Sequence, residues 1–295
     1  MIQKEKTVVV GGCGFLGSHV SDSLTKQGYQ VVVYDNSPPK WLNDNQDFVQ
    51  GDVRDFELLK ETIAGSDYVY NFAALADLNS AQDKPLETAE INILGNLNVL
   101  EASRINNIKR FIYASTVYVH SKDGGFYKCS KQASESYVEE YAKHYALDYT
   151  ILRYGSLYGP RADQTNGVYR IIEHALKEGK VLYKGNADSM REYIHVFDAA
   201  EASVKILSED YKNESIILTG QEPMRVLDFL HMIAEILNLP EKSVEFVNGV
   251  YSGHYVRTPY AYQPKFGKKY IPSMHVDLGQ GLLQFITEMQ ENIVS

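Results

Sequence analysis

The stretch Thr7-Val8-Val9-Val10-Gly11-Gly12-Cys13-Gly14-Phe15-Leu16-Gly17 decides how this chain of 295 residues folds. Its β-branched beginning predicts a buried strand, and a helical pattern follows at about 15–27. Between them Gly11, Gly14 and Gly17 form a GxxGxxG. The first two permit a tight turn whose backbone amides approach a phosphate at the helix N-terminus, and the third permits close packing of helix on strand. Because Gly-rich turns join many strands and helices, the neighbouring residues decide what this one binds.

The residues after the loop favour a dinucleotide. A second predicted strand, Gln30–Tyr34, ends at Asp35, 18 residues after Gly17. An acid there accepts hydrogen bonds from the ribose hydroxyls of NAD and repels the 2′-phosphate of NADP. The following Asn36-Ser37-Pro38-Pro39 contains no arginine that could receive such a phosphate. The sequence therefore predicts NAD, with Asp35 and Asn36 among its contacts.

Strands and helices alternate along the first half, which is typical of βαβ units. We therefore expect an α/β fold, a doubly wound parallel sheet (Rossmann-like) with a smaller, mixed substrate-binding lobe. The cofactor domain would take residues 1–160 and about 190–222, and the lobe about 161–189 and 223–295. The expected strands are 7–10, 30–34, 47–49, 68–72, 110–114, 149–152 and 215–218, and the expected helices lie near 15–27, 55–64, 85–107, 126–146, 167–178, 196–208, 225–238 and 276–292.

Two short stretches that follow predicted strands could touch the same cofactor. Asp52-Val53 comes after the third strand, where a loop can reach the adenine, although Asp52 equally suits a turn or the N-cap of the next helix. Ala73-Ala74 closes the fourth strand and is small enough for a cofactor to lie against its backbone, although simple packing uses the same residues.

A tyrosine and a lysine could carry out proton transfer. Tyr127 and Lys131 share one face of the helix expected over 126–146. A phenol with a pKa of about 10 is a poor base, but a nearby cation lowers that pKa. Tyr127 could then exchange a proton with a substrate hydroxyl while a hydride moves to or from a nicotinamide. The hydroxyls of Ser115-Thr116, at the end of the fifth strand, could bond the same substrate oxygen or could merely cap a turn.

Composition excludes several classes of protein. The net charge of −9 argues against nucleic acid as a partner and leaves any anionic substrate to a few local cations. No signal peptide or long apolar run is present, so we expect no membrane partner and a cytoplasmic protein. Cys13 and Cys129 are too few for a disulfide framework and are interpreted as small packing residues, and we assign no metal.

In their order along the chain, these motifs resemble an extended short-chain dehydrogenase/reductase, and more narrowly the NAD-dependent epimerase/dehydratase family that acts on nucleotide sugars. The resemblance is strong over about residues 7–220. It is carried by Gly11–Gly17, Asp35, Asp52, Ala73-Ala74, Asn92 in Ile91-Asn92-Ile93-Leu94-Gly95-Asn96, Ser115-Thr116, Tyr127 with Lys131, and the stretches 153–161 and 191–198.

The resemblance implies roles for individual residues. Tyr127, Lys131 and either Ser115 or Thr116 would be catalytic, with Lys131 also on the nicotinamide ribose. The cofactor-binding set would be Gly11, Gly14, Phe15, Leu16, Gly17, Asp35, Asn36, Asp52, Val53, Ala73, Ala74, Asn92 and Lys131. Arg191 and Arg257 would grip the diphosphate of a nucleotide sugar, where guanidinium geometry is useful, with Tyr154 and Arg161 also in the substrate-binding set. The resemblance also implies that the protein takes part in polysaccharide biosynthesis.

The sequence departs from the family pattern between the strand-end hydroxyl and the catalytic tyrosine. Only residues 117–126 intervene, which obscures the working hydroxyl; counting from the strand end favours Thr116, and Ser115 stays as the alternative. Dehydratases of the family carry an Asp-Glu pair directly after the catalytic Thr, because removing water needs an acid and a base. Val117-Tyr118 stands there instead, so a 4,6-dehydratase is disfavoured.

We therefore expect an NAD-dependent oxidoreductase that oxidises the 4-hydroxyl of the glycosyl group of a nucleotide sugar, either as a 4-epimerase or as a net dehydrogenase. A non-catalytic NAD-binding redox sensor is the alternative, although such proteins generally lack the Tyr/Lys pair. The family commonly forms dimers through the two helices expected here at 85–107 and 126–146. Tyr137, Tyr141 and Tyr145 at a spacing of four suit such a homodimer interface, or an ordinary core face.

Overall fold

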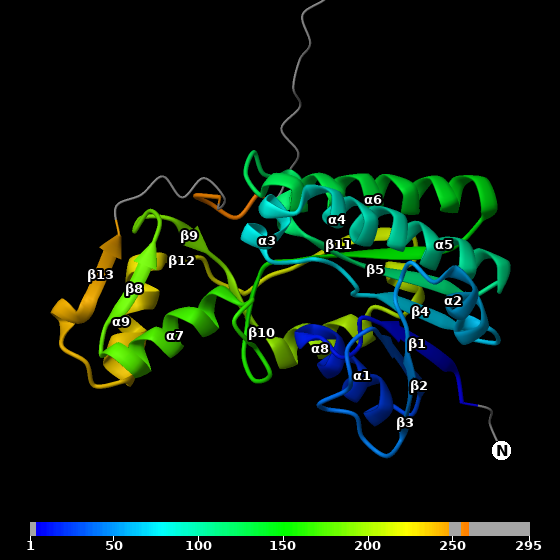
Figure 1. The fold of residues 1–295 in the computed structure, drawn as a ribbon, viewed down its shortest axis with the longest axis horizontal. Coiled ribbons are helices and arrows are strands. Elements are labelled where there is room, and N and C mark those ends of the chain that lie inside the picture. Colours follow the sequence, from blue (N-terminus) through cyan, green and yellow to red (C-terminus); the bar gives the residue numbers. More distant parts are fainter. Residues whose placement is uncertain (1–3, 248–254, 260–295) are drawn as a thin grey trace, which may run out of the picture. The chain divides into compact units, whose positions relative to one another are not determined.

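The computed structural model describes residues 4–247 and 255–259, and these residues form the expected doubly wound parallel sheet (Figure 1). Its seven strands lie in the order β11-β6-β5-β4-β1-β2-β3, and all neighbours pair in parallel. The order reverses between β1 and β4, which opens a crevice at the carboxyl ends of these strands. The bounds are β1 Lys6–Val10, β2 Gln30–Asp35, β3 Gln46–Gln50, β4 Tyr68–Asn71, β5 Arg110–Thr116, β6 Tyr149–Tyr154 and β11 Glu214–Leu218.

Successive side chains of β1 point alternately into the hydrophobic clusters on the two faces of the sheet. Val8 and Val10 pack with α2 (Phe56–Ile63), α5 (Gly95–Ile105) and α6 (Gly125–Tyr145) on one face. Val9 packs with α1 (Phe15–Lys26) and α8 (Val196–Lys205) on the other. Figure 1 shows the two helical layers on opposite sides of the sheet. The unbroken run of valines thus follows from burial on both faces, as in other parallel sheets.

The expected long helix at 85–107 is interrupted. It consists of α4 (Pro85–Ala89), a π-helical turn (Glu90–Leu94) and α5. Inside the π turn, Asn92 Oδ1 accepts from the backbone N–H of Leu75 at 2.7 Å, and its Nδ2 donates to Ser130 Oγ at 2.9 Å. The wider turn aims Asn92 at the loop after β4, a contact that helical periodicity alone does not predict. A short helix that the sequence did not predict, α3 (Leu78–Asp83), follows the same loop.

A third, smaller hydrophobic cluster lies in the later part of the chain. It joins α7 (Gly167–Glu178), α9 (Val226–Ile236) and the parallel pair of β8 (Val181–Lys184) with β13 (Val244–Val247). Two further pairs connect it to the main sheet region: β7 (Ser156–Tyr158) with β10 (Tyr193–His195), and β9 (Met190–Arg191) with β12 (Met224–Arg225). The helix expected at 276–292 lies outside the described residues.

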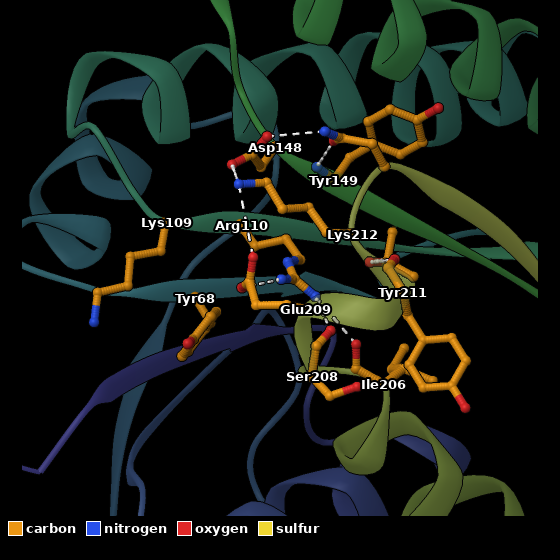
Figure 2. A network of polar contacts seen from close by, with 12 residues as sticks. Tyr68, Lys109, Arg110, Asp148, Tyr149, Ile206, Ser208, Glu209, Tyr211 and Lys212 are labelled. Carbon is orange, nitrogen blue, oxygen red and sulfur yellow. Dashed lines mark hydrogen bonds and ion pairs between the residues drawn. The ribbon is translucent and has the colours of Figure 1, made fainter.

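A buried arginine ties the connection before β11 to the amino end of β5. Arg110 donates to the carbonyl oxygens of Ile206 (3.2 Å) and Ser208 (2.9 Å) and to Glu209 (2.8 Å), as Figure 2 shows. In the same network, Lys212 pairs with Asp148 at 2.6 Å. These contacts hold the last strand in the sheet from the end opposite the crevice. Within the part of the chain described, no helix is both long and apolar enough to span a bilayer.

Candidate active site

Two cavities open at the carboxyl ends of the sheet and share part of their walls. The first measures about 560 Å³ and the second about 500 Å³. The first contains Asp35 and the second contains Tyr127, so the predicted cofactor and catalytic residues lie in adjoining spaces. Both cavities are lined by Gly11, Gly14, Phe15, Phe72, Ala74 and Asp163.

The glycine loop is shaped for a ligand that lies on the backbone. Gly11 has a φ of +78°, and a Cβ at this residue would collide with the backbone of Ala73. A Cβ on Gly17 would collide with the carbonyl oxygen of Gly11, so helix α1 could not sit this close to the loop. The N-cap residue of α1 is Gly14, which offers no capping side chain to the first amides of the helix. These amides can therefore receive a phosphate.

Asp35 lies at the end of β2 in the first cavity, held by two backbone amides. Its Oδ2 accepts from the N–H of Cys13 at 3.0 Å and its Oδ1 from the N–H of Ser37 at 2.9 Å. Each oxygen keeps a lone pair for a ribose hydroxyl. Burial and Asp35 together raise the pKa of the Cys13 thiol to about 12, so Cys13 is neutral at physiological pH.

Asp52, Val53, Asn36, Ala73 and Ala74 also line the first cavity. Asp52 forms a turn, since it accepts from the backbone N–H of Arg54 and pairs with its guanidinium at 2.7 Å. The helix N-cap that Asp52 might have provided is Asp55, which accepts from the N–H of Leu58 at 3.1 Å. Asp52 thus has both the turn role and a place on the cavity wall.

Asn92 and Arg161 lie elsewhere than the resemblance implied. Asn92 is only 1% exposed and holds the backbone of Leu75 from behind, so it shapes the wall rather than forming it. Arg161, implied to be a substrate residue, lines the first cavity together with Asp35. It pairs with Asp22 of α1 at 2.7 Å and lies over the ring of Trp41 at 5.2 Å. Its second guanidinium nitrogen is buried and has no hydrogen-bond partner among the described residues.

Sequence reasoning did not place any cation near Asp35. Arg161 and Lys40 both line the first cavity. Arg161 arrives from a loop more than 120 residues after Asp35, as their numbers give. No local spacing signals such an approach.

The catalytic candidates meet in the second cavity. Tyr127 and Thr116 share a side-chain hydrogen bond. Lys131 Nζ donates to the carbonyl oxygen of Ala114 at 2.7 Å and lies 5.9 Å from the centre of the Tyr127 ring. Ser115 points differently: its hydroxyl donates to Glu135 at 2.5 Å. The geometry favours Thr116 over Ser115 as the hydroxyl that works with Tyr127.

The expected lowering of the pKa of Tyr127 by Lys131 is absent. Burial raises the pKa of Tyr127 to about 12, and the hydrogen bond from Thr116 offsets only part of this. Burial lowers the pKa of Lys131 to about 7. Desolvation disfavours the charged form of both groups and is the largest influence on each pKa.

Arg191 also lines the second cavity, where its guanidinium donates to the carbonyl oxygen of Met190 at 3.1 Å. It is 5% exposed and lies over the ring of Tyr255 at 4.4 Å. Tyr118 packs against Tyr255 with ring centres 4.8 Å apart. Tyr154 lines the cavity with its ring, but its hydroxyl bonds Ser203 of α8 at 2.6 Å and so faces the core. Arg257 is exposed and is absent from the described residues that line either cavity.

The model of the NAD dependent epimerase/dehydratase family matches residues 7–218. The chain belongs to this family. A relative from Methanocaldococcus jannaschii with the provisional name UDP-glucose 4-epimerase is 31% identical over 73% of this chain and 77% of its own length. Like its family, the chain is an NAD-dependent enzyme of the extended short-chain dehydrogenase/reductase type that acts on nucleotide sugars.

Solved structures of similar enzymes match nearly the whole chain. The UDP-glucose 4-epimerase of Thermotoga maritima with UDP-glucose superposes with a TM-score of 0.78 at 28% identity, covering 87% of this chain and 90% of the other. The UDP-glucose 4-epimerase of Thermus thermophilus in complex with NAD gives 0.76 at 26% identity, covering 89% and 95%.

The residues of the first cavity fit NAD. A side chain at Gly11 or Gly17 would collide with the backbone of the glycine loop, so only glycine lets a ligand approach this backbone closely. The N-terminus of α1, which has no capping side chain, suits the pyrophosphate. Asp35 suits the adenosine ribose, and the buried, unpartnered nitrogen of Arg161 suits an anionic or hydroxyl oxygen of the same ligand.

Proposed function

We propose that this enzyme is a UDP-sugar 4-epimerase. The observation that carries the proposal is the meeting of Tyr127, Thr116 and Lys131 in the second cavity, which shares part of its wall with the first cavity and is also lined by Arg191. The names of the similar enzymes support UDP as the nucleotide and the 4-position as the reacting carbon.

In this proposal each side chain has a separate task. Tyr127 Oη takes the proton of the 4-hydroxyl, and Thr116 shares a hydrogen bond with the same oxygens. The charged form of Lys131 favours the phenolate of Tyr127. NAD, when bound, would supply the acceptor and the donor of hydride for this oxidation and its reversal. Arg191 holds the diphosphate, while Arg257 would have to turn inward to assist.

The absence of an acid pair beside Thr116 supports this choice over a 4,6-dehydratase. Val117 and Tyr118 begin a 3-10 turn (Val117–His120) directly after β5. Val117 is fully buried and Tyr118 packs on Tyr255. Neither side chain can donate and accept protons for the loss of water at neutral pH.

A panel of UDP-, GDP- and dTDP-sugars tests the function. NADH absorbance and the stereochemistry of the product are followed together. A 4-epimerase yields the C4 epimer without net NADH, whereas a net dehydrogenase accumulates NADH and a keto sugar. Binding of NAD without turnover on any sugar would contradict the proposal and favour the redox sensor.

Tyr127→Phe tests the assignment of the base. We expect kcat to fall by about 10²- to 10⁴-fold with little change in NAD affinity, because the phenol oxygen is lost and the ring remains. Tyr137→Phe, on the exposed side of the same helix, serves as the control and should keep wild-type kcat. Equal turnover of Tyr127→Phe and wild type would remove Tyr127 from the mechanism.

We also propose a homodimer formed through α5 and α6, and a substrate lobe formed by about 161–189 and 223–295. Exposed apolar side chains on these helices support the dimer: Ile105 is 41%, Tyr137 44% and Tyr145 56% exposed. Sedimentation would check the homodimer, since Tyr137→Glu should shift the population toward monomer by placing a charge in the interface.

The C4 epimers that the enzyme interconverts would serve polysaccharide biosynthesis.

A further inference from the structure

One aromatic ring in the second cavity lies between the catalytic residues and the arginine proposed to hold the diphosphate. Tyr118 lines this cavity together with Thr116, Tyr127 and Arg191. It belongs to the 3-10 turn that follows β5 and comes two residues after Thr116. Its ring is therefore part of the wall against which a substrate would lie.

On one side, the ring of Tyr118 packs against the beginning of the catalytic helix α6. The N-cap residue of α6 is Gly124, in the left-handed conformation with a φ of +101°. A Cβ on Gly124 would lie only 2.8 Å from Cδ1 of Tyr118, so glycine alone leaves room for the ring. Gly124 precedes Tyr127 by three residues, about one helical turn. The contact therefore acts on the turn of α6 that carries Tyr127.

The backbone of Tyr118 orients the catalytic hydroxyl. Its N–H donates to Thr116 Oγ1 at 3.3 Å and so caps the 3-10 turn. Because Oγ1 accepts this bond, its own hydrogen is available for the side-chain hydrogen bond with Tyr127. The turn that brings the Tyr118 ring into the cavity thus also sets the direction of Thr116.

On the other side, the ring of Tyr118 meets the aromatic support of Arg191. The ring centres of Tyr118 and Tyr255 lie 4.8 Å apart, and the guanidinium of Arg191 lies 4.4 Å from the centre of the Tyr255 ring. Tyr255 is 3% exposed. The next residue, Val256, accepts from the backbone N–H of Met190 in β9 at 2.7 Å, so this support is fastened to the strand that carries Arg191.

We propose that Tyr118 is a positioning residue for the substrate. Its ring, held between the start of α6 and the support of Arg191, sets the separation between that guanidinium and the hydroxyl of Tyr127. A nucleotide sugar gripped at its diphosphate by Arg191 then presents one hydroxyl of its glycosyl group to Tyr127. A misplacement of about 1 Å can cost about 100-fold in rate. The proposal rests on the proposed function, and Tyr118 itself takes no proton.

Tyr118→Leu tests the proposal, because it removes the ring and keeps an apolar side chain. We expect kcat to fall about 10- to 100-fold on the UDP-sugar that the wild type turns over, since bound substrate is misaligned. Affinities for UDP and for NAD, measured by calorimetry, should stay within about threefold of wild type, because the ring of Tyr255 still supports Arg191. Tyr118→Phe keeps the ring and should restore kcat to within about threefold.

Tyr158→Leu is the matched control. Tyr158 is half-buried like Tyr118 and packs on the ring of His195 at 5.2 Å, but it is absent from the described residues that line either cavity. This variant should keep the wild-type kcat. Tyr118→Met fills more of the space of the lost ring, should show the same fall in kcat, and serves if the leucine variant does not fold.

Circular dichroism and Tm establish that each variant is folded. A folded Tyr118→Leu enzyme with the wild-type kcat, a loss confined to KM or to UDP affinity, or an equal loss in Tyr118→Phe would overturn the proposal. Wild-type protein without turnover on any UDP-sugar would instead contradict the proposed function.

Discussion

At the scale of single residues, Asp35 carries the choice of cofactor. Its two oxygens accept from the amides of Cys13 and Ser37, which fixes the carboxylate toward the cavity. Arg161 and Lys40, which could receive a 2′-phosphate, already line the same space. We therefore expect the discrimination against NADP to depend on the charge of this one side chain.

Asp35→Asn should weaken NAD binding about tenfold and allow NADP to bind, because the repelling charge and one acceptor oxygen are lost. Calorimetric titration with both cofactors measures this. Asp47→Asn on the exposed side of β3 is the matched control and should bind both cofactors as wild type does. Unaltered affinities in the Asp35 variant would show that the ribose is recognised elsewhere.

At the scale of elements, one end of β5 carries active-site candidates and the other end carries a stabilising network. Its carboxyl end carries Ser115 and Thr116 in the active site, and its amino end carries Arg110 in the network of Figure 2. The two ends are separated by about 20 Å, given a rise of about 3.3 Å per residue. Stability and catalysis can therefore be altered independently along one strand.

Arg110→Met should lower the free energy of unfolding by about 2–4 kcal/mol, because buried carbonyl oxygens of the connection before β11 lose their donor. Kinetic constants should stay at wild-type values. Denaturant unfolding and steady-state kinetics on the same preparation test both expectations. Lys212→Met is the control: its ion pair with Asp148 is partly exposed, so the loss should stay below about 1 kcal/mol. Equal losses in the two variants would contradict the assignment of Arg110 as the anchor.

At the scale of the whole molecule, the two cavities lie where the direction of chain winding changes. Strands β1 and β4 lie next to each other in the centre of the sheet, and the loops after them form much of the wall common to both cavities. NAD would therefore stabilise the sheet and its loops as one unit.

Saturating NAD should raise Tm, since a ligand at about 100 times its Kd adds about 2.7 kcal/mol to the stability of the native state. The same concentration of NADP should raise Tm much less, because Asp35 opposes its 2′-phosphate. Thermal melts with each cofactor, followed by circular dichroism, check this. Equal shifts with both cofactors would contradict the preference for NAD.

The sequence by itself determined the features that depend on local spacing. The strand, glycine loop and helix of residues 7–26, Asp35 at the end of β2, and the pair Tyr127 and Lys131 on one helical face all follow from periods of two and four residues.

Only the tertiary structure decided what depends on distant segments meeting. It turned Ser115 toward Glu135 and left Thr116 with Tyr127, placed Arg161 in the first cavity with Asp35, and opened a π turn so that Asn92 could hold Leu75. It also reversed the expected change in the pKa of Tyr127. Burial sets the cost of charge, and burial exists only once the sheet and helices have packed together.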